Sequence, residues 1–284
     1  MNVAGHSRLD TEGGYIRMEI IMTENKLDMI ADKLTNLGNY VDKLEVTLSN
    51  EIVQLLSEQL YRSPLKAIEE LVVNAYDADA TECRIFVPLP SDNANRFIVV
   101  FDNGIGMDYD GLVNLWQIGR SNKRTDEVSN RSQRKQIGKF GIGKLATYTI
   151  THRVTYISKS KSSTLAVTLN FKDFAKSVAN SPVELSVQEI IDWNTFSNQT
   201  IFKTACSLIG INPGMLSTAK NKSWTFAILE DLKPKAQSIQ QSRLKWVLST
   251  AMPLQNNFLL FLNGEQIVRL MAALICMGVL VIKV

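Results

Sequence analysis

Three polar residues are spaced so that a helix would carry them on one face. Glu70, Asn74 and Asp77 stand at positions i, i+4 and i+7, and the apolar stripe of the same segment falls elsewhere. The carboxylate of Glu70 could act as a general base toward a water that attacks a phosphate. The amide oxygen of Asn74 is a hard ligand of the kind that Mg²⁺ accepts beside phosphate oxygens and waters. Taken alone, these residues also fit an ordinary surface helix.

A second group of residues follows a continuously apolar run, 97–101, which is typical of a central strand. The run ends at Asp102, whose carboxylate could accept a hydrogen bond from the exocyclic amine of adenine. Gly104 and Gly106 would let the backbone turn tightly and approach the base, and Met107 suits packing against a flat ring. The alternative is an Asp-Asn-Gly turn between two strands.

A third group is a glycine-rich stretch that leads into a predicted helix over residues 144–150. Free backbone amides at a helix start bind phosphate where glycines permit a close approach. The stretch contains Gly138, Lys139, Phe140, Gly141, Ile142, Gly143 and Lys144. One of its lysines could neutralise phosphate charge, or both could be solvated. The spacing matches neither a P-loop nor a dinucleotide-binding fold, so the common P-loop class of ATPase is excluded.

In order and spacing, the three groups resemble the N, G1 and G2 boxes of the GHKL ATPases. This superfamily includes gyrase-type topoisomerases, heat-shock chaperones, histidine kinases, mismatch-repair ATPases and Microrchidia proteins. The resemblance covers roughly residues 50–230. It implies that Glu70 is the base, that Asn74 holds Mg²⁺ and that Asp102 reads adenine. It also implies that the G2 glycines lie under the phosphates in a mobile lid.

Further residues are brought in by the same resemblance. Asp77 would buttress the site or bind the nucleotide through water, and the stretch with Ser121 and Lys123 resembles the start of the lid. Thr225 matches only part of a Gly-Thr pair, because Trp224 stands in the glycine place and leaves the role of Thr225 open. The candidate ATP-binding residues are Asn74, Asp77, Asp102, Gly104, Gly106, Met107, Ser121, Lys123, Gly138, Lys139, Phe140, Gly141, Ile142, Gly143, Lys144 and Thr225.

The fold that the resemblance implies is a Bergerat-type α/β sandwich of the α+β kind. It has two layers, a mixed, mostly antiparallel sheet and helices on one face. We expect an N-terminal leader and helix in residues 1–48 and the ATP-binding domain in residues 49–232. Residues 233–284 would begin a transducer-like second domain that is truncated.

Hydrophobic periodicity predicts the elements that would position the candidate residues. Helices are predicted at 24–37, 49–60, 64–78, 144–150 and 238–250. Strands are predicted at 83–87, 97–101, 153–158, 164–170, 224–229 and 258–262, with a turn at 263–264. Ser63 is the expected N-cap of the helix that begins at Pro64. The polar stretch 119–137 is expected to be either a functional lid or disordered, and 171–223 gives no clear pattern.

The composition is that of a globular protein, with 45% hydrophobic and 21% charged residues in a chain of 284. Three separated cysteines and the lack of a visible signal peptide favour the cytoplasm. The apolar stretch 270–282 is too short for a membrane span, so no membrane association is expected. Residues 120–144 carry eight basic residues against two acidic ones. They could cradle a polyphosphate, form a solvated loop or bind nucleic acid, although no aromatic residues are interleaved.

These observations favour Mg²⁺-dependent binding and hydrolysis of ATP, coupled to lid closure and a conformational or dimerisation cycle. The expected partners are ATP and either a second copy of the chain or another protein. One alternative is a kinase-type domain that acts on a separate protein. Another is a nucleotide-binding regulatory module that does not hydrolyse ATP.

Overall fold

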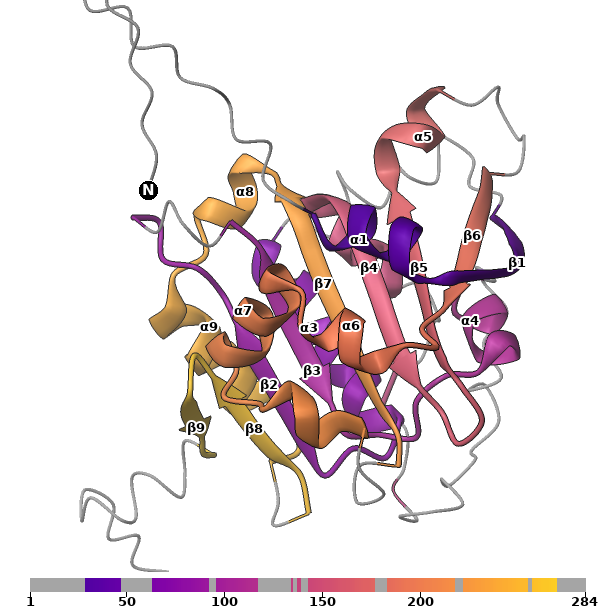
Figure 1. Cartoon of the computed structure of the whole chain (residues 1–284). Helices are drawn as coiled ribbons and strands as arrows, with labels where there is room; N and C mark the ends of the chain where they lie inside the picture. Colours follow the sequence, from indigo (N-terminus) through magenta and orange to yellow (C-terminus); the bar gives the residue numbers. More distant parts are fainter. Residues whose placement is uncertain are drawn as a thin grey trace, which may run out of the picture.

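The structure is a computed structural model that describes residues 29–46, 63–91, 96–116, 134, 137–138, 143–176, 183–217, 222–254 and 257–269. Within these ranges, one sheet of nine strands runs through the molecule (Figure 1). Several predictions lie outside the described residues: the leader, the start of the first helix, the helix over 49–60, most of the 119–137 stretch and the apolar stretch 270–282.

The strand order is β1-β6-β5-β4-β7-β3-β2-β8-β9. Every neighbouring pair is antiparallel except β2 and β8, which are parallel. The strands are β1 (Asn39–Val46), β2 (Glu82–Phe86), β3 (Ile98–Asp102), β4 (Thr151–Lys159), β5 (Thr164–Asn170), β6 (Val183–Glu189), β7 (Trp224–Leu232), β8 (Leu259–Leu262) and β9 (Glu265–Ile267). All five residues of β3 are buried, as expected for a strand near the middle of the sheet.

Helices cover both faces of this sheet. One face packs against α3 (Pro64–Asp77), α4 (Tyr109–Trp116), the 3₁₀ helix η3 (Gly143–Thr149), α5 (Phe171–Lys176), α8 (Pro234–Gln237) and α9 (Gln241–Ala251). The opposite face packs against α1 (Ile30–Leu37), α6 (Trp193–Ser197), α7 (Thr200–Leu208) and the 3₁₀ helix η4 (Pro213–Ser217). In Figure 1 the helices α1, α6 and α7 lie in front of the strands.

Helix α3 carries the first group of candidate residues and is held by its apolar stripe. Ile68 and Val72 are fully buried in the core against the sheet, and each such side chain contributes about 1.5–3 kcal/mol of transfer free energy. Pro64 occupies the first turn, as predicted. The Ser63 side chain makes no capping hydrogen bond, so the start of the helix depends on Pro64 rather than on the predicted cap.

The predicted fold class is confirmed: the sheet is mixed and mostly antiparallel, and it packs against helices. The prediction placed helices on one face, and the structure adds a second helical layer on the other. The predicted helix over 144–150 is a 3₁₀ helix, η3. The boundaries at 48/49 and 232/233 stay predictions as domain limits. Strands from all three predicted segments, β1, β2–β7 and β8–β9, belong to the same sheet.

Candidate nucleotide-binding site

Four residues form a row across the middle of the sheet. The strand registers pair Cys83 with Asp102, Asp102 with Thr225, and Thr225 with Ser158, so the row crosses β2, β3, β7 and β4. Cys83 belongs to the core that packs against α3, and residues paired side by side in a sheet point to the same face. The row therefore brings Asp102 and Thr225, two candidates 123 positions apart in the chain, together on the α3 face.

The carboxylate of Asp102 is buried, with 8% of the residue exposed. Its Oδ1 accepts a hydrogen bond of 2.9 Å from the backbone N–H of Gly104. Burial raises the pKa of Asp102 to about 7, because desolvation disfavours the charged form, and the Gly104 hydrogen bond opposes this shift only in part. A carboxyl group with a perturbed pKa at the end of a central strand is a candidate for ligand recognition.

The loop after β3 is packed tightly against the protein at both of its candidate glycines. A Cβ at Gly104 would lie 2.6 Å from the carbonyl oxygen of Ala78, at the end of α3. A Cβ at Gly106, whose φ is +68°, would lie 2.0 Å from the carbonyl oxygen of Lys159. From the sequence we expected both glycines to allow a close approach of the backbone to the adenine base. In the structure their closest neighbours are the end of α3 and the end of β4.

Two serines also hold this loop, and the sequence did not identify either of them. Ser158 accepts a hydrogen bond of 2.7 Å from the N–H of Met107, and Ser223 donates one of 2.6 Å to the carbonyl oxygen of Gly104. The Ser158 hydroxyl also lies 3.0 Å from that of Thr225. In the sequence, Ser158 is only a small polar residue at the end of an apolar run. Its contact with Thr225 becomes visible only once the register between β4 and β7 is known.

Trp224 and Thr225 lie on opposite faces of β7. The Trp224 side chain is 1% exposed, packs in the core against α6 and α7, and donates from Nε1 to the carbonyl oxygen of Leu216 at 3.0 Å. The large residue in the glycine place therefore leaves the face that carries Thr225 unobstructed. Whether Thr225 contacts a nucleotide stays a prediction.

On α3, Asp77 connects the helix to the start of the glycine-rich stretch. Its two carboxylate oxygens accept hydrogen bonds from the backbone N–H groups of Ile137 at 2.9 Å and Gly138 at 3.0 Å. The residue is 8% exposed. Asp77 thus fixes the backbone that leads into the G2 box, and any direct contact of Asp77 with a ligand stays a prediction.

Glu70 lies one turn before Asn74, and both side chains are half-buried. Lys66 Nζ lies 3.4 Å from a carboxylate oxygen of Glu70 and 2.7 Å from one of Glu69. Desolvation lowers the pKa of Lys66, but the two carboxylates outweigh it and raise the pKa above its ordinary value. The helical spacing singled out Glu70 as the candidate base and excluded Glu69. In the structure, Lys66 contacts the carboxylates of both.

Most candidates from the glycine-rich stretch and from the predicted start of the lid lie outside the described residues. They are Ser121, Lys123, Lys139, Phe140, Gly141 and Ile142. Gly143 and Lys144 form the first turn of η3, of which only the backbone is described. Candidate phosphate contacts from this stretch therefore stay predictions.

One of the eight basic residues of the 120–144 window has a role that the sequence did not predict. Arg134 is 7% exposed and donates from Nη1 to the carbonyl oxygen of Ala80 at 2.6 Å and from Nη2 to that of Asn257. Its guanidinium lies 5.0 Å from the ring centroid of Tyr76 and 5.9 Å from that of Phe258. Arg134 is a buried structural cation that joins the end of α3 to β8.

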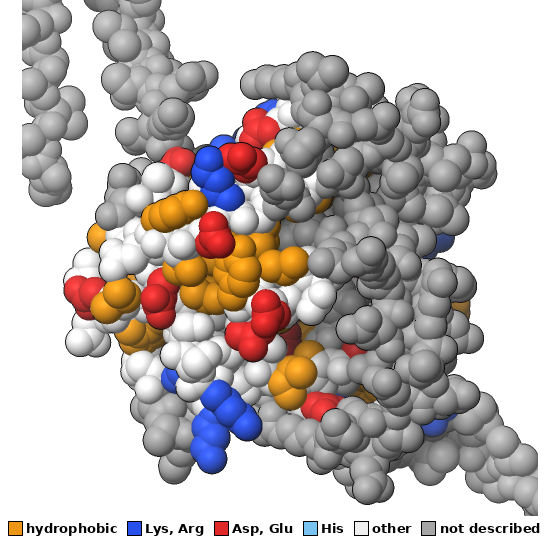
Figure 2. All heavy atoms as spheres, turned by 90° about the vertical axis from the view of Figure 1, so that its right-hand side faces the viewer, with side chains coloured by type: hydrophobic (Ala, Val, Ile, Leu, Met, Phe, Trp, Pro, Cys, Tyr) orange, Lys and Arg blue, Asp and Glu red, His pale blue; other side chains and the backbone are white. Residues whose placement is uncertain are grey.

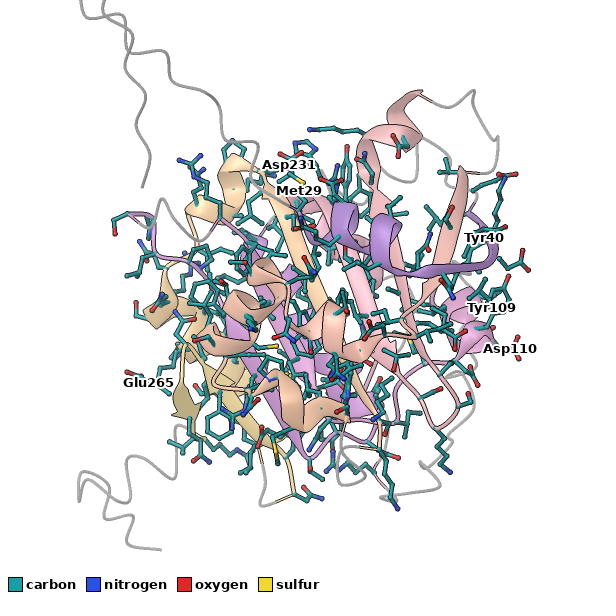
Figure 3. All side chains as sticks on the ribbon, in the orientation of Figure 1. Met29, Tyr40, Tyr109, Asp110, Asp231 and Glu265 are labelled. Carbon is teal, nitrogen blue, oxygen red and sulfur yellow. The ribbon has the colours of Figure 1, made fainter. Side chains whose placement is uncertain are left out.

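A separate hollow of about 270 Å³ lies at the β1 edge of the sheet. Figure 2 views this side and shows hydrophobic side chains gathered among acidic ones, and Figure 3 shows Tyr40, Tyr109 and Asp110 at the same edge. The hollow is lined by Val41, Asp108, Tyr109, Asp110, Ser162, Ser163, Leu165 and Glu189. Its three carboxylates would repel a polyphosphate, so it does not compete with the α3 face as a nucleotide site.

The residues that the structure describes contain no group of three His, Cys, Asp or Glu side chains that could enclose a metal ion. Among the helices of those same residues, none has the length and apolar character needed to cross a bilayer.

Comparison with known proteins places the site within a family. The family model described as "Histidine kinase-, DNA gyrase B-, and HSP90-like ATPase" matches residues 61–201. This range contains all three sequence boxes, and Thr225 lies beyond it.

Three relatives illustrate the similarity. The ATPase MORC2B of Mus musculus is 42% identical over 78 residues, which cover 27% of this chain and 7% of that protein. The endoplasmin homolog of Caenorhabditis elegans is 29% identical over 133 residues, covering 39% of this chain and 18% of that protein. The chaperone protein HtpG of Myxococcus xanthus is 30% identical over 131 residues, covering 39% and 20%. The chain thus spans a fifth or less of the length of these relatives. Together with the strand-end carboxylate and the polar face of α3, the family match identifies residues 61–201 as an ATPase domain of the GHKL type.

Proposed function

We propose that this chain binds ATP together with Mg²⁺ on the α3 face of the sheet and hydrolyses it. The observation that supports this most directly is the position of Asp102. Its buried carboxylate ends β3 beside Thr225, within a segment that matches an ATPase family. An acceptor held at a fixed point in a low-dielectric site suits the exocyclic amine of adenine.

Each residue of the site then has a chemical task. Asp102 accepts a hydrogen bond from the adenine amine, and Asp77 holds the backbone at Ile137 and Gly138 where the glycine-rich stretch begins. Glu70 takes the proton of the attacking water as general base. Lys66, 3.4 Å from Glu70, restricts the orientation of that carboxylate.

Asn74 is the residue that would hold Mg²⁺. An ion bound by one amide oxygen together with phosphate oxygens and waters needs no cage of carboxylates, in keeping with the donor set on the described part of α3. When bound, Mg²⁺ would neutralise charge on the phosphates.

We further propose that residues 119–137 close over the bound nucleotide and that closure is coupled to self-association or to a partner protein. Anchors at the end of this stretch, through Arg134 and through Ile137 to Asp77, support this proposal. A non-hydrolysable ATP analogue should protect residues 119–137 from protease and increase the mass seen by light scattering. Unchanged cleavage would contradict closure, and unchanged mass would contradict self-association.

The first test of the function compares two adjacent glutamates. Glu70→Ala should lower Mg²⁺-dependent ATP hydrolysis at least about 100-fold, because the general base is lost, while ATP binding persists. Glu69→Ala is the matched control, because Glu69 also contacts Lys66 and should leave hydrolysis nearly unchanged.

The outcomes separate the alternatives. Hydrolysis that survives in Glu70→Ala would remove Glu70 from the mechanism. ATP binding without hydrolysis by the wild type would favour the regulatory module. Phosphate transfer to an added protein would favour the kinase-type domain. A wild type that binds no ATP would overturn the site.

A further inference from the structure

Three members of the row across the sheet, Asp102, Thr225 and Ser158, are called the polar row here. Ser158 is the member to which the proposed function assigns no task. The residue is 0% exposed. Its hydroxyl oxygen has three polar neighbours: the N–H of Met107 at 2.7 Å, Thr225 Oγ1 at 3.0 Å and the carbonyl oxygen of Trp224 at 3.3 Å. A buried hydroxyl with so many partners restricts the hydrogen bonding of each partner.

The hydrogen bonds around Ser158 leave two arrangements of its proton. The backbone N–H of Met107 can only donate, so Ser158 accepts there and has one proton left to donate. Its two possible acceptors are Thr225 Oγ1 at 3.0 Å and the Trp224 carbonyl oxygen at 3.3 Å. The shorter distance favours Thr225, which then keeps its own proton for a ligand. In the opposite arrangement Thr225 donates to Ser158 and offers a ligand only lone pairs.

The two arrangements would select different purines. Adenine presents a donor at its exocyclic amine and an acceptor at the neighbouring ring nitrogen, whereas guanine presents an acceptor and a donor at the same positions. Asp102 as acceptor beside Thr225 as donor complements adenine. Asp102 beside Thr225 as a second acceptor would instead accommodate the ring N–H of guanine.

We propose that Ser158 is a positioning residue that makes Thr225 a hydrogen-bond donor and thereby sets the preference for adenine over guanine. This inference rests on the proposed binding of ATP at Asp102. Ser158 acts through Thr225 and does not touch the nucleotide. Its bond to Met107 also holds the loop after β3 in register with β4.

The same strand offers a matched control. Thr155 on β4 is also 0% exposed, and its hydroxyl lies 3.0 Å from that of its cross-strand partner Thr168 on β5. Thr155 lies three residues before Ser158, so its side chain points to the opposite face of the sheet. Removing this hydroxyl perturbs a comparable buried pair without reaching the row.

The experiment measures affinities for Mg²⁺-ATP and Mg²⁺-GTP by calorimetry on the full chain. Ser158→Ala should reduce the ratio of ATP to GTP affinity about tenfold. Thr155→Val should leave the ratio at the wild-type value even where it lowers stability. In a Thr225→Val background, Ser158→Ala should change the ratio little further, because both act through one hydroxyl.

An unchanged ratio in Ser158→Ala, or an equal change in Thr155→Val, would overturn the proposal. If Ser158→Ala does not fold, Ser158→Cys is measured instead, because a thiol is a weak hydrogen-bond donor: a reduced ratio supports the role, and an unchanged ratio overturns it. A wild type that binds neither nucleotide would instead show that the proposed function has failed, and the two failures are therefore distinguishable.

Discussion

The two faces of the sheet differ most at the ends of the same strands. On the α3 face, β3 and β7 present Asp102 and Thr225, and β4 adds Ser158 beside them. One residue earlier on β3 and one later on β7, Phe101 and Phe226 point to the opposite face with ring centroids 4.9 Å apart. Alternation of side chains along a strand thus lets one backbone support a polar site and an aromatic core.

The face of the sheet opposite α3, called the aromatic face here, carries a continuous cluster of aromatic rings. The polar row on the α3 face lies at the ends of three strands. Phe202 contacts Phe196, Phe226 and Trp193 at centroid distances of 4.8, 5.3 and 5.7 Å. The polar row, by contrast, contains a buried carboxyl group whose ionisation is disfavoured where it lies. We infer that the apolar cores on both faces supply stability, and that the α3 face in addition retains unfavourable polar groups at its strand ends for binding.

The largest expected effect comes from weakening the aromatic face. Phe202→Ala should lower the free energy of unfolding by about 3–5 kcal/mol, because Phe202 is fully buried and the change leaves a cavity. Phe202→Leu should cost less. Denaturant titration gives the stability, and calorimetry gives the ATP affinity of the folded protein, which should stay constant. A parallel fall in affinity would show that the faces are not independent.

A smaller effect on stability is expected at Asp102, on the α3 face. Unlike Phe202→Ala, the substitution Asp102→Asn should make the protein more stable than the wild type at high pH. The pKa of Asp102 is raised from 3.8 to about 7 in the folded protein, so its ionisation opposes folding. This contribution to stability is fully present below pH 3.8 and is lost as pH rises through about 7. Asp102→Asn keeps an acceptor for the Gly104 N–H and removes the titration.

Between pH 5 and pH 8, the wild type should therefore lose about 2–3 kcal/mol of stability relative to Asp102→Asn. Denaturant titrations of both proteins across this range test the expectation, and parallel curves would contradict it. At the same time Asp102→Asn should abolish adenine-nucleotide binding. Unchanged ATP affinity in this variant would remove Asp102 from base recognition.

The smallest expected change in stability comes from alanine substitutions at two glycines, which distinguish the cost of backbone strain from the cost of close packing. Gly106 and Gly264 both have positive φ, +68° and +83°, but a Cβ at Gly264 would meet no atom within 4 Å. Gly264→Ala should cost about 1 kcal/mol for the conformation alone, and Gly106→Ala about 2 kcal/mol or more because it also meets Lys159. Gly106→Ala should in addition weaken ATP binding. Equal losses of stability would show that the loop after β3 moves freely.

Local patterns were sufficient where elements are long or strongly periodic. The predicted strand 164–170 coincides with β5, and the predicted helix 64–78 differs from α3 by one residue. The strands β1 and β6 were missed because many of their residues are polar and because they become strands through pairing with each other across more than 130 residues. The helices α6 and α7 fall in the stretch that gave no clear pattern.

The same distinction holds for the candidate site. Asp102 and Gly106 could be proposed from the sequence because each belongs to a short motif that is contiguous in the chain. Ser158 was not found, since its contact with Thr225 depends on the register between β4 and β7. Arg134 was grouped with the basic window 120–144, for which a polyphosphate cradle, a solvated loop and nucleic-acid binding stayed open, because the sequence gives no sign that Tyr76 and Phe258 enclose its guanidinium.

The strand order has a consequence for the order of events during synthesis. The polar row takes residues 102, 158 and 225 from three strands, and β7 inserts between β3 and β4 only after both have been made. Contacts that join such distant residues form slowly, because the intervening chain must first be ordered. A growing chain therefore cannot assemble the polar row until β7 has left the ribosome. Nucleotide binding by a nascent chain would accordingly mark the completion of the sheet centre rather than an early folding step.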